Sequence, residues 1–367
     1  MKRFNLIAAI LIANFAFPLC GNATKSTKKT LAHPAPGSTR HAFAPGPLYG
    51  HRPDTLARAN EIAEHHGLDA HWTRQVLAQA RYLPQVTRLV LPAGAGQKKN
   101  WAAYRSRFID PVRIAAGVRF WQAHAGWLAR AEAVYGVPPE IVVGILGVET
   151  LYGQQTGHFR VLDTLATLAF DFPAAHPRAA ARQAFFQDEL AQFLALMHRS
   201  GGNPLAVRGS FAGAIGLPQF MPSSIVRHAV DFDGDGTLDL AHSPADAIGS
   251  VAAYFKAFGW RPGMPTHYAL RLDPAQVDLD ALLAPDILPT FSVESLAARG
   301  AVVEAAGQQH AGPLALVELQ MGEQAPVYVA GTENFYAITR YNWSSYYAMA
   351  VIELGQKIAR LTAPKTD

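Results

Sequence analysis

The sequence contains a single cysteine, Cys20, among 367 residues. A set of disulfide bonds therefore cannot hold the fold together, and the chain must rely on a hydrophobic core. Charged residues are also scarce, at 16% of the chain, whereas half of the residues are hydrophobic. This length and composition predict a folded protein with two or three domains.

Acidic residues are absent from the first 53 positions, where seven lysines and arginines occur. The formal charge of +4 is thus concentrated at the N-terminus, and the rest of the chain has 25 basic and 28 acidic residues. A nucleic-acid-binding protein would carry its basic residues on the folded body. The charge distribution therefore argues against nucleic acid as a partner.

Residues 1–23 have the pattern of a secretory signal peptide. Lys2 and Arg3 precede the apolar run FNLIAAILIANFAF, which is too short for a membrane span and is followed by small residues. Cleavage after Ala23 is expected. The alternative is lipidation of Cys20, although the preceding Phe-Pro-Leu lacks the small residue of a lipoprotein signal. We expect a periplasmic protein or, in the alternative, an outer-membrane lipoprotein whose membrane contact is through Cys20 alone.

The remaining chain divides by composition into five parts. Residues 24–53 are rich in Lys, Ser, Thr, Pro and Gly and predict a flexible basic linker. Apolar residues three and four apart predict a helical domain over 54–136, with helices in TLARANEIAEHHG (55–67) and VRIAAGVRFWQAHAGWLARAEAVYG (112–136), each closed by its final glycine. A second, mostly helical region is predicted over 137–263. Alternating and β-branched residues in THYALRL, ALVELQ and PVYVAG predict strands of a small β domain over 264–333, and 334–362 return to helix. The expected fold class is mainly α (α+β).

One glutamate interrupts an apolar helix in the segment PPEIVVGILGVETLYG, residues 138–153. Val142, Ile145, Leu146 and Glu149 share one stripe, and the opposite positions are apolar too. Burial disfavours the charged form of a carboxyl group and raises its pKa. Glu149 is therefore either a buried carboxyl satisfied by structural partners or a proton donor for glycosidic cleavage.

The segment DFDGDGTLDL resembles the first half of an EF-hand loop. Asp231, Asp233 and Asp235 stand at positions one, three and five, and Thr237 at position seven would offer its carbonyl oxygen. Position twelve is His242 instead of the usual glutamate. The segment therefore predicts either a structural Ca²⁺ site or an Asp/Gly turn without metal.

These segments, taken in order, resemble the soluble and membrane-bound lytic murein transglycosylase B family. The matching segments are GVETLYG, LDTLATLAFDFP, GSFAGAIGLPQFMPSS, AVDFDGDGTLDL, DAIGSVAAYFKAFGW and NFYAITRYNWSSYYAMAV. The resemblance extends from about residue 50 to about residue 360. It implies a lysozyme-like helical catalytic core with an N-terminal helical domain and a small inserted β-sheet domain.

The resemblance also implies a reaction. Enzymes of this family cut the β-1,4 bond between N-acetylmuramic acid and N-acetylglucosamine in peptidoglycan and leave a 1,6-anhydro end. One glutamate, which Glu149 matches, acts first as acid and then as base, and no cofactor takes part in catalysis. Asp163 and Asp171, the next carboxylates along the chain, are not expected to be nucleophiles, and Asp163 is expected to cap the helix that follows it.

The family's sugar-binding and calcium-binding residues carry over one position at a time. The residues implied to bind substrate are Tyr104, Arg182, Ser210, Gln219, Tyr254, Tyr341, Asn342 and Tyr347. The family closes its calcium loop with a later aspartate, and Asp246 matches it. One departure is Ala181, which stands where the family often has a second arginine beside Arg182; Arg178 is a candidate substitute.

Two other functions stay open at this level: a hydrolytic muramidase that uses water, and a non-catalytic peptidoglycan-binding scaffold. The retained Glu149 disfavours the scaffold. The expected partners are peptidoglycan glycan strands and, as candidates, wall-synthesis enzymes. We expect the protein to be a monomer.

Overall fold

The computed structural model describes residues 46–92 and 99–363. The expected signal peptide, Cys20 and residues 24–45 of the expected linker lie outside the described residues. The end of that linker differs from the prediction, because Tyr49–His51 form a short 3₁₀ helix, η1, and Tyr49 is buried.

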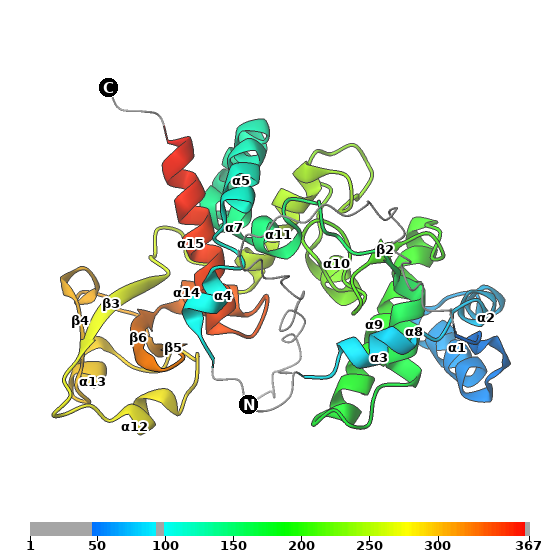
Figure 1. Cartoon of the computed structure of the whole chain (residues 1–367). Coiled ribbons are helices and arrows are strands. Elements are labelled where there is room, and N and C mark those ends of the chain that lie inside the picture. Colours follow the sequence, from blue (N-terminus) through cyan, green and yellow to red (C-terminus); the bar gives the residue numbers. More distant parts are fainter. Residues whose placement is uncertain (1–45, 93–98, 364–367) are drawn as a thin grey trace, which may run out of the picture.

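Helices make up most of the described chain (Figure 1). The N-terminal helices are α1 Pro53–His66, α2 Ala70–Ala78, α3 Pro84–Leu89, α4 Trp101–Arg105, α5 Pro111–Ala123 and α6 Ala125–Tyr135. The central helices are α7 Pro139–Thr150, α8 Val161–Phe170, α9 Ala179–Ser200, α10 Pro222–His228 and α11 Pro244–Ala257, and the last are α14 Glu333–Thr339 and α15 Ser345–Thr362.

The predicted signals at helix ends are mostly confirmed. Gly67 and Gly136 follow α1 and α6 with positive φ angles of 63° and 70°, a conformation in which glycine has no Cβ to clash. The apolar pattern over residues 112–136 does not form one helix, however. It breaks at His124, where α5, packed on α15, gives way to α6, packed on α11.

A four-stranded antiparallel sheet lies beside the helical core (Figure 1). Its strands are β3 His267–Leu272, β4 Ala301–Val303, β5 Ala315–Met321 and β6 Gln324–Gly331, in the order β4-β3-β6-β5, with helices α12 Leu279–Leu283 and α13 Val293–Ala297 and the 3₁₀ helix η2 Ala305–Gly307 between them. A two-stranded sheet pairs β1 Phe159–Arg160 with β2 Arg208–Gly209. The mainly α (α+β) fold class is confirmed, whereas the domain limits stay a prediction.

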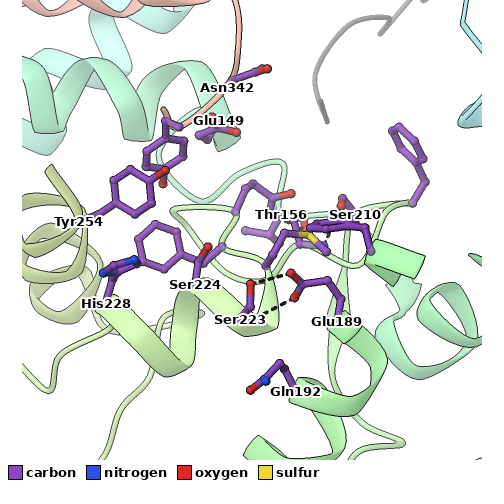
Figure 2. A pocket seen from close by; sticks show the side chains of 18 of the residues that line it. Glu149, Thr156, Glu189, Gln192, Ser210, Ser223, Ser224, His228, Tyr254 and Asn342 are labelled. Carbon is purple, nitrogen blue, oxygen red and sulfur yellow. Dashed lines mark hydrogen bonds between the residues drawn. The ribbon is translucent and has the colours of Figure 1, made fainter. Parts of the chain in front are cut away.

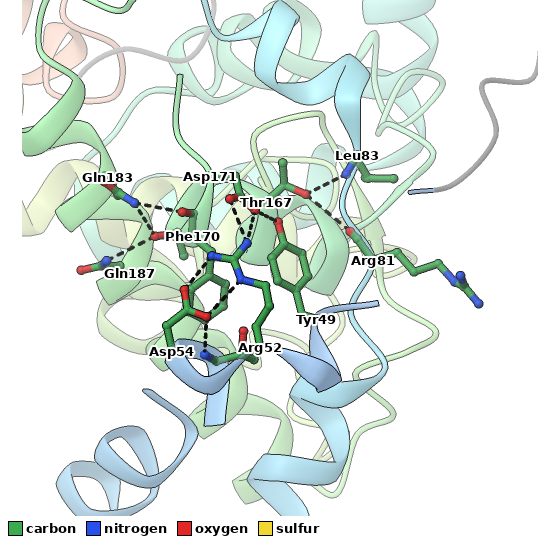
Figure 3. Close-up of polar contacts among 12 residues, drawn as sticks. Tyr49, Arg52, Asp54, Arg81, Leu83, Thr167, Phe170, Asp171, Gln183 and Gln187 are labelled. Atoms are coloured by element: carbon green, nitrogen blue, oxygen red, sulfur yellow. Dashed lines mark hydrogen bonds and ion pairs between the residues drawn. The ribbon is translucent and has the colours of Figure 1, made fainter. Parts of the chain in front are cut away.

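The N-terminal segment is fixed to the helical core by a polar network (Figure 3). The Tyr49 hydroxyl donates to Asp171 Oδ2 at 2.5 Å, and Arg52 Nη1 donates to both Asp171 oxygens at 2.8 and 2.7 Å. Nearby, Thr167 Oγ1 on α8 accepts from the Leu83 N–H at 3.0 Å. These contacts fix the segments just before α1 and α3 to α8 and to the residue that follows it.

Helices α7 and α15 pack along each other at the centre of the molecule (Figure 1). A Cβ on Gly144 would lie 2.3 Å from the Val351 carbonyl oxygen, and one on Gly355 would lie 1.9 Å from the Glu140 carbonyl oxygen. The two backbones therefore touch where these glycines stand. Val142, Ile145 and Leu146 of the predicted apolar stripe are fully buried, as the pattern predicted.

In the described part of the chain, no single helix has the length and apolar character needed to cross a membrane, and only α6 and α7 taken together, bent by 116° at their break, pass the same test.

We predict that Gly355→Ala destabilises the protein by at least about 2 kcal/mol, because the added methyl must force α15 away from the α7 backbone. The matched control is Gly126→Ala, near the exposed start of α6, where a Cβ meets nothing within 4 Å. That change should leave stability equal or slightly higher. Thermal and urea unfolding measure both, and equal unfolding midpoints for the two variants would contradict the close-packing argument.

Candidate active site

A cavity of about 1460 Å³ runs between the N-terminal helices and the helical core. Its lining comes from α1, α7, α9, α10, α11 and the segment after α14, so it joins parts of the chain far apart in sequence. Figure 2 shows Glu149 and Asn342 at one end of the pocket and Glu189 and Gln192 at another. The predicted residues that line it are Tyr104, Glu149, Arg182, Ser210, Gln219, Tyr254, Tyr341 and Asn342.

Glu149 lies in the wall of this cavity with one carboxyl oxygen satisfied. Its Oε1 accepts a hydrogen bond of 2.5 Å from the hydroxyl of Tyr347, which is itself fully buried behind it. Of the residues expected to bind substrate, Tyr347 is the one that does not line the cavity. Its Oε2 is buried and has no hydrogen-bond partner among the described residues. Burial raises the pKa of Glu149 to about 8, although the Tyr347 hydroxyl acts in the opposite direction. The carboxyl group is thus neutral at pH 7, with Oε2 as the oxygen that can carry its proton.

The chain turns sharply just after Glu149. Leu151 and Tyr152 have φ angles of 50° and 56°, in the left-handed region that residues other than glycine seldom adopt. Thr150 holds this turn, because its hydroxyl donates to the Leu217 carbonyl at 2.8 Å and accepts from the Gly153 N–H at 3.0 Å. The Tyr152 ring stacks on Phe120. This strained end of α7 fixes the position of the glutamate.

Ser210 and Gln219 are held by backbone groups around the cavity. Ser210 Oγ accepts from the Ala214 N–H at 3.0 Å. Gln219 has a φ of 51°, and its side-chain amide nitrogen donates to the carbonyls of Gly216 and Thr156 at 2.9 and 3.2 Å. The amide oxygen of Gln219 is then the group that can accept from a sugar hydroxyl.

Aromatic rings form one wall beside Glu149. The Tyr254 hydroxyl donates to the Arg340 carbonyl at 2.6 Å, and the Tyr341 hydroxyl donates to the Pro218 carbonyl. Their rings meet at a centroid distance of 4.9 Å. Desolvation and the nearby Glu149 raise the pKa of Tyr104, Tyr254 and Tyr341, so all three hydroxyls stay protonated. Such rings can cover the apolar faces of sugars.

Asn342 and Arg182 also reach the cavity from different elements. Asn342 is 8% exposed and follows Tyr341 in the segment between α14 and α15. Arg182, in the first turn of α9, stacks on Phe185 and Phe186 at 5.5 and 5.4 Å from the ring centroids. Desolvation lowers the pKa of Arg182 to about 10, with a further contribution from Arg178.

Asp163 and Asp171, the two carboxylates that follow Glu149 in the sequence, have structural partners. Asp171 bonds Tyr49 and Arg52 as described above, and neither it nor Asp163 lines the cavity. The helix-cap prediction for Asp163 was wrong, because Arg160 is the N-cap of α8. Asp163 lies in the first turn of that helix, where it accepts from the Arg81 N–H at 2.9 Å and pairs with Arg160 at 2.5 Å.

Glu189 is a second buried carboxyl in the cavity that the sequence did not single out. Its Oε1 accepts from the Ser223 hydroxyl at 2.6 Å and its Oε2 from the Ser223 N–H at 2.9 Å (Figure 2). Burial raises its pKa, while both Ser223 bonds favour the charged form. Both of its oxygens are thus engaged at the start of α10, unlike those of Glu149.

The sequence also missed one face of α1 that lines the cavity. Arg58, Ile62, His65 and His66 stand at i, i+4, i+7 and i+8, which places them on the same side of the helix. The helical spacing is visible in the sequence, but nothing in it shows that this face is directed toward α9 and not toward solvent.

The aspartate loop lies between α10 and α11. The carboxylates of Asp231, Asp233 and Asp246 each offer an oxygen within 4.8 Å of the others, and the donors that reach them are neutral. Asp246 is buried and accepts from the N–H groups of Phe232 and Asp239, both at 2.8 Å. The structure does not bring Asp235 into this cluster, since its carboxylate accepts from the Thr237 N–H at 2.7 Å.

A family model described as transglycosylase SLT domain matches residues 52–356. The chain is 39% identical to the membrane-bound lytic murein transglycosylase B of Escherichia coli strain K12 over 328 residues, which cover 85% of this chain and 84% of that protein.

Solved structures agree with this sequence match. The lytic transglycosylase Slt35 of E. coli in complex with calcium aligns with a TM-score of 0.73 at 39% identity, over 88% of this chain and 98% of that one. SltB3 from Pseudomonas aeruginosa, in complex with NAG-NAM-pentapeptide, aligns with a TM-score of 0.69 at 29% identity, over 83% and 79% of the two chains. The chain therefore belongs to the transglycosylase SLT domain family, as a lytic murein transglycosylase of the peptidoglycan-cleaving type.

Proposed function

We propose that this cavity binds a peptidoglycan glycan strand and that Glu149 alone performs the acid and base steps of its cleavage. The observation that carries the proposal is the environment of Glu149. One oxygen accepts from Tyr347, the other is buried and without a partner, and the group stays protonated up to about pH 8. A neutral carboxylic acid in a sugar-sized cavity is the group that glycosidic cleavage needs.

In the first step, Glu149 donates its proton to the glycosidic oxygen as the bond from that oxygen to C1 of N-acetylmuramic acid breaks. N-acetylglucosamine leaves with a free hydroxyl, and the substrate's own acetamido group stabilises the positive charge at C1. In the second step, the Glu149 carboxylate takes the proton from the C6 hydroxyl while that oxygen bonds to C1. The 1,6-anhydro end forms and Glu149 is protonated again, so no water is consumed.

The neighbouring side chains then have binding roles. Tyr104, Tyr254 and Tyr341 cover sugar faces, while Ser210, Gln219 and Asn342 bind hydroxyl and acetamido groups near Glu149. Tyr347 positions the glutamate through its short hydrogen bond. Arg182 lies where the muramoyl side of the substrate would pass, and its stacking on two phenylalanines keeps it in place.

A hydrolytic muramidase of the retaining type would need a second carboxylate about 5 Å from the acid. Asp163 and Asp171 lie outside the cavity lining, and both oxygens of Glu189 are bonded to Ser223. These positions favour the transglycosylase reaction.

We also propose a structural Ca²⁺ site in the loop between α10 and α11. Asp231, Asp233 and Asp246 are carboxylates gathered at one point, and oxygen ligands of this kind fit Ca²⁺. The calcium complex of Slt35 supports the proposal. Both oxygens of Asp246 already accept hydrogen bonds from the loop backbone, so the loop is formed without an ion. A bound ion would further stabilise it. The Thr237 carbonyl and the Asp235 carboxylate stay predicted ligands.

We further propose that the protein works in the periplasm, at the cell envelope. The membrane-bound relative and the peptidoglycan fragment in SltB3 support this location. The choice between cleavage after Ala23 and lipidation of Cys20, the monomeric state and contact with wall-synthesis enzymes stay predictions.

We predict that Glu149→Gln lowers turnover of purified sacculi by at least 100-fold, a magnitude of about the kind general acid–base catalysis contributes. Glutamine keeps the size of the side chain and can still accept from Tyr347, so the fold should be intact. Mass spectrometry of the released muropeptides checks both rate and product. Activity within tenfold of wild type, or reducing ends in place of anhydro ends, would sink the proposal.

The raised pKa of Glu149 predicts a pH dependence of activity and of stability. Turnover should fall above about pH 8, where the acid loses its proton. Because the folded pKa lies above the unfolded value of 4.5, the protonated group stabilises the fold below pH 4.5, and this contribution is lost between 4.5 and about 8. Urea unfolding of wild type and Glu149→Gln at pH 5 and 8.5 tests this. The variant should gain stability relative to wild type as pH rises, and a constant difference would contradict burial of the acid.

We predict that Ca²⁺ raises the melting temperature, because an ion that binds only the folded state stabilises it. Asp231→Asn with Asp233→Asn should remove this effect, since asparagine keeps a hydrogen-bond acceptor for the loop but removes two charges. Thermal melts with Ca²⁺, with Mg²⁺ at equal ionic strength and with chelator measure it. Identical wild-type melts under all three conditions would count against the site.

A further inference from the structure

The catalytic cavity is rich in arginine although the glycan strand it would bind is uncharged. Its described lining contains six arginines and no lysine: Arg58, Arg107, Arg113, Arg182, Arg227 and Arg340. The acids in the same lining are Asp188, Glu189 and Glu149, and Glu149 is neutral at pH 7. N-acetylglucosamine carries no carboxylate, and the carboxyl group of N-acetylmuramic acid is bonded to its peptide as an amide. The carboxylates of the substrate therefore belong to the peptide.

Several of these arginines make hydrogen bonds or ring contacts within the protein. Arg113 donates to the carbonyls of Gly147 and Arg107 at 3.0 and 2.7 Å. The Arg340 guanidinium stacks over the ring of Trp343 at 5.6 Å, as well as over two further aromatic rings. These two side chains hold the loops of the cavity in place.

Arg58 is placed differently, on α1, the helix whose cavity-lining face is directed toward α9. Its Nη1 pairs with the exposed Glu61 at 3.0 Å, a surface pair of small energetic weight. Its Nε is buried and has no hydrogen-bond partner among the described residues. The side chain as a whole is 26% exposed, so the exposed part of the guanidinium can donate to a carboxylate that enters the cavity.

The surroundings of Arg58 suit an acidic peptide more than a sugar. His66 on the same face has its pKa lowered by burial and then by Arg199, His65 and Arg58, so the local field is positive. Asp188 on α9 is the opposing charge, and it acts on His66 less than each of these. Ile62, on the same face of α1, is 2% exposed and gives this end of the cavity an apolar floor.

We infer that the α1 end of the cavity, with Arg58 as its central group, binds a carboxylate of the peptide attached to N-acetylmuramic acid. The inference rests on the proposed function, because it takes a peptidoglycan strand as the substrate. It adds a subsite on α1, so that a second cation acts beside Arg182 in a chain that has Ala181 next to that residue.

The test is isothermal titration calorimetry with two soluble disaccharides, N-acetylglucosaminyl-N-acetylmuramic acid with its pentapeptide and the peptide-free disaccharide whose lactyl carboxyl group is capped as a simple amide. Neither contains the bond that the enzyme would cut, so wild-type protein can be used. Arg58→Gln should weaken binding of the peptide-bearing disaccharide by about tenfold, the loss typical of a hydrogen bond to a charged group. Binding of the peptide-free disaccharide should change less than twofold.

Arg74→Gln is the matched control, since Arg74 is an exposed arginine on the adjacent helix α2 whose Nη1 donates to Asn60 and which does not line the cavity. It should bind both ligands as wild type does. An equal loss for both disaccharides in Arg58→Gln, or no loss for either, would overturn the inference. Product analysis of sacculi tests the proposed function separately, because this titration depends on binding alone.

Discussion

Direct backbone contact between α7 and α15 is the constraint on which the site depends. Gly144 and Gly355 leave no room for a side chain between the helices. Because of this approach, Tyr347 on α15 reaches Glu149 on α7 with a 2.5 Å hydrogen bond. Larger residues at the crossing would separate the donor from the acid. The hydrogen bond of one buried carboxyl group thus depends on two glycines that do not line the cavity.

The lining of the cavity has two different electrostatic environments. Around Glu149, burial raises the pKa of the carboxyl group, while the hydrogen bond from Tyr347 lowers it by a smaller amount, so the group is neutral at pH 7. Toward α1 and α9 the lining becomes cationic, with Arg58 and Arg182. A neutral acid and a positive flank are compatible, because the Glu149 pKa is set by desolvation and Tyr347 and not by these arginines.

The sequence predicted the elements that follow from local patterns. The apolar stripe placed Glu149 in a buried helix wall, Gly67 ended its helix, and alternation found three of the four strands of the larger sheet. The substrate residues gathered in one cavity came from resemblance, since no local pattern relates Tyr104 to Asn342.

What sequence could not predict depends on tertiary contacts. The break at His124 follows from α5 and α6 packing on different partners. The expected linker ends before residue 53 because the Tyr49 side chain is buried and its hydroxyl donates a hydrogen bond to Asp171, 122 residues later in the chain. The prediction that Asp163 caps its helix was wrong because Arg160 is the N-cap of α8. The sequence did not identify the face of α1 that carries Arg58 as part of the cavity, because the direction of that face depends on packing against α9.

The order of the chain determines when the surroundings of Glu149 are complete. Its hydrogen-bond partner Tyr347 belongs to α15 and follows Glu149 by 198 residues. During synthesis the acid is made long before the helix that buries and orients it. A nascent chain that lacks α15 therefore holds Glu149 without its hydrogen bond from Tyr347. The order of synthesis thus means that the environment of Glu149 is completed only after α15 has been made.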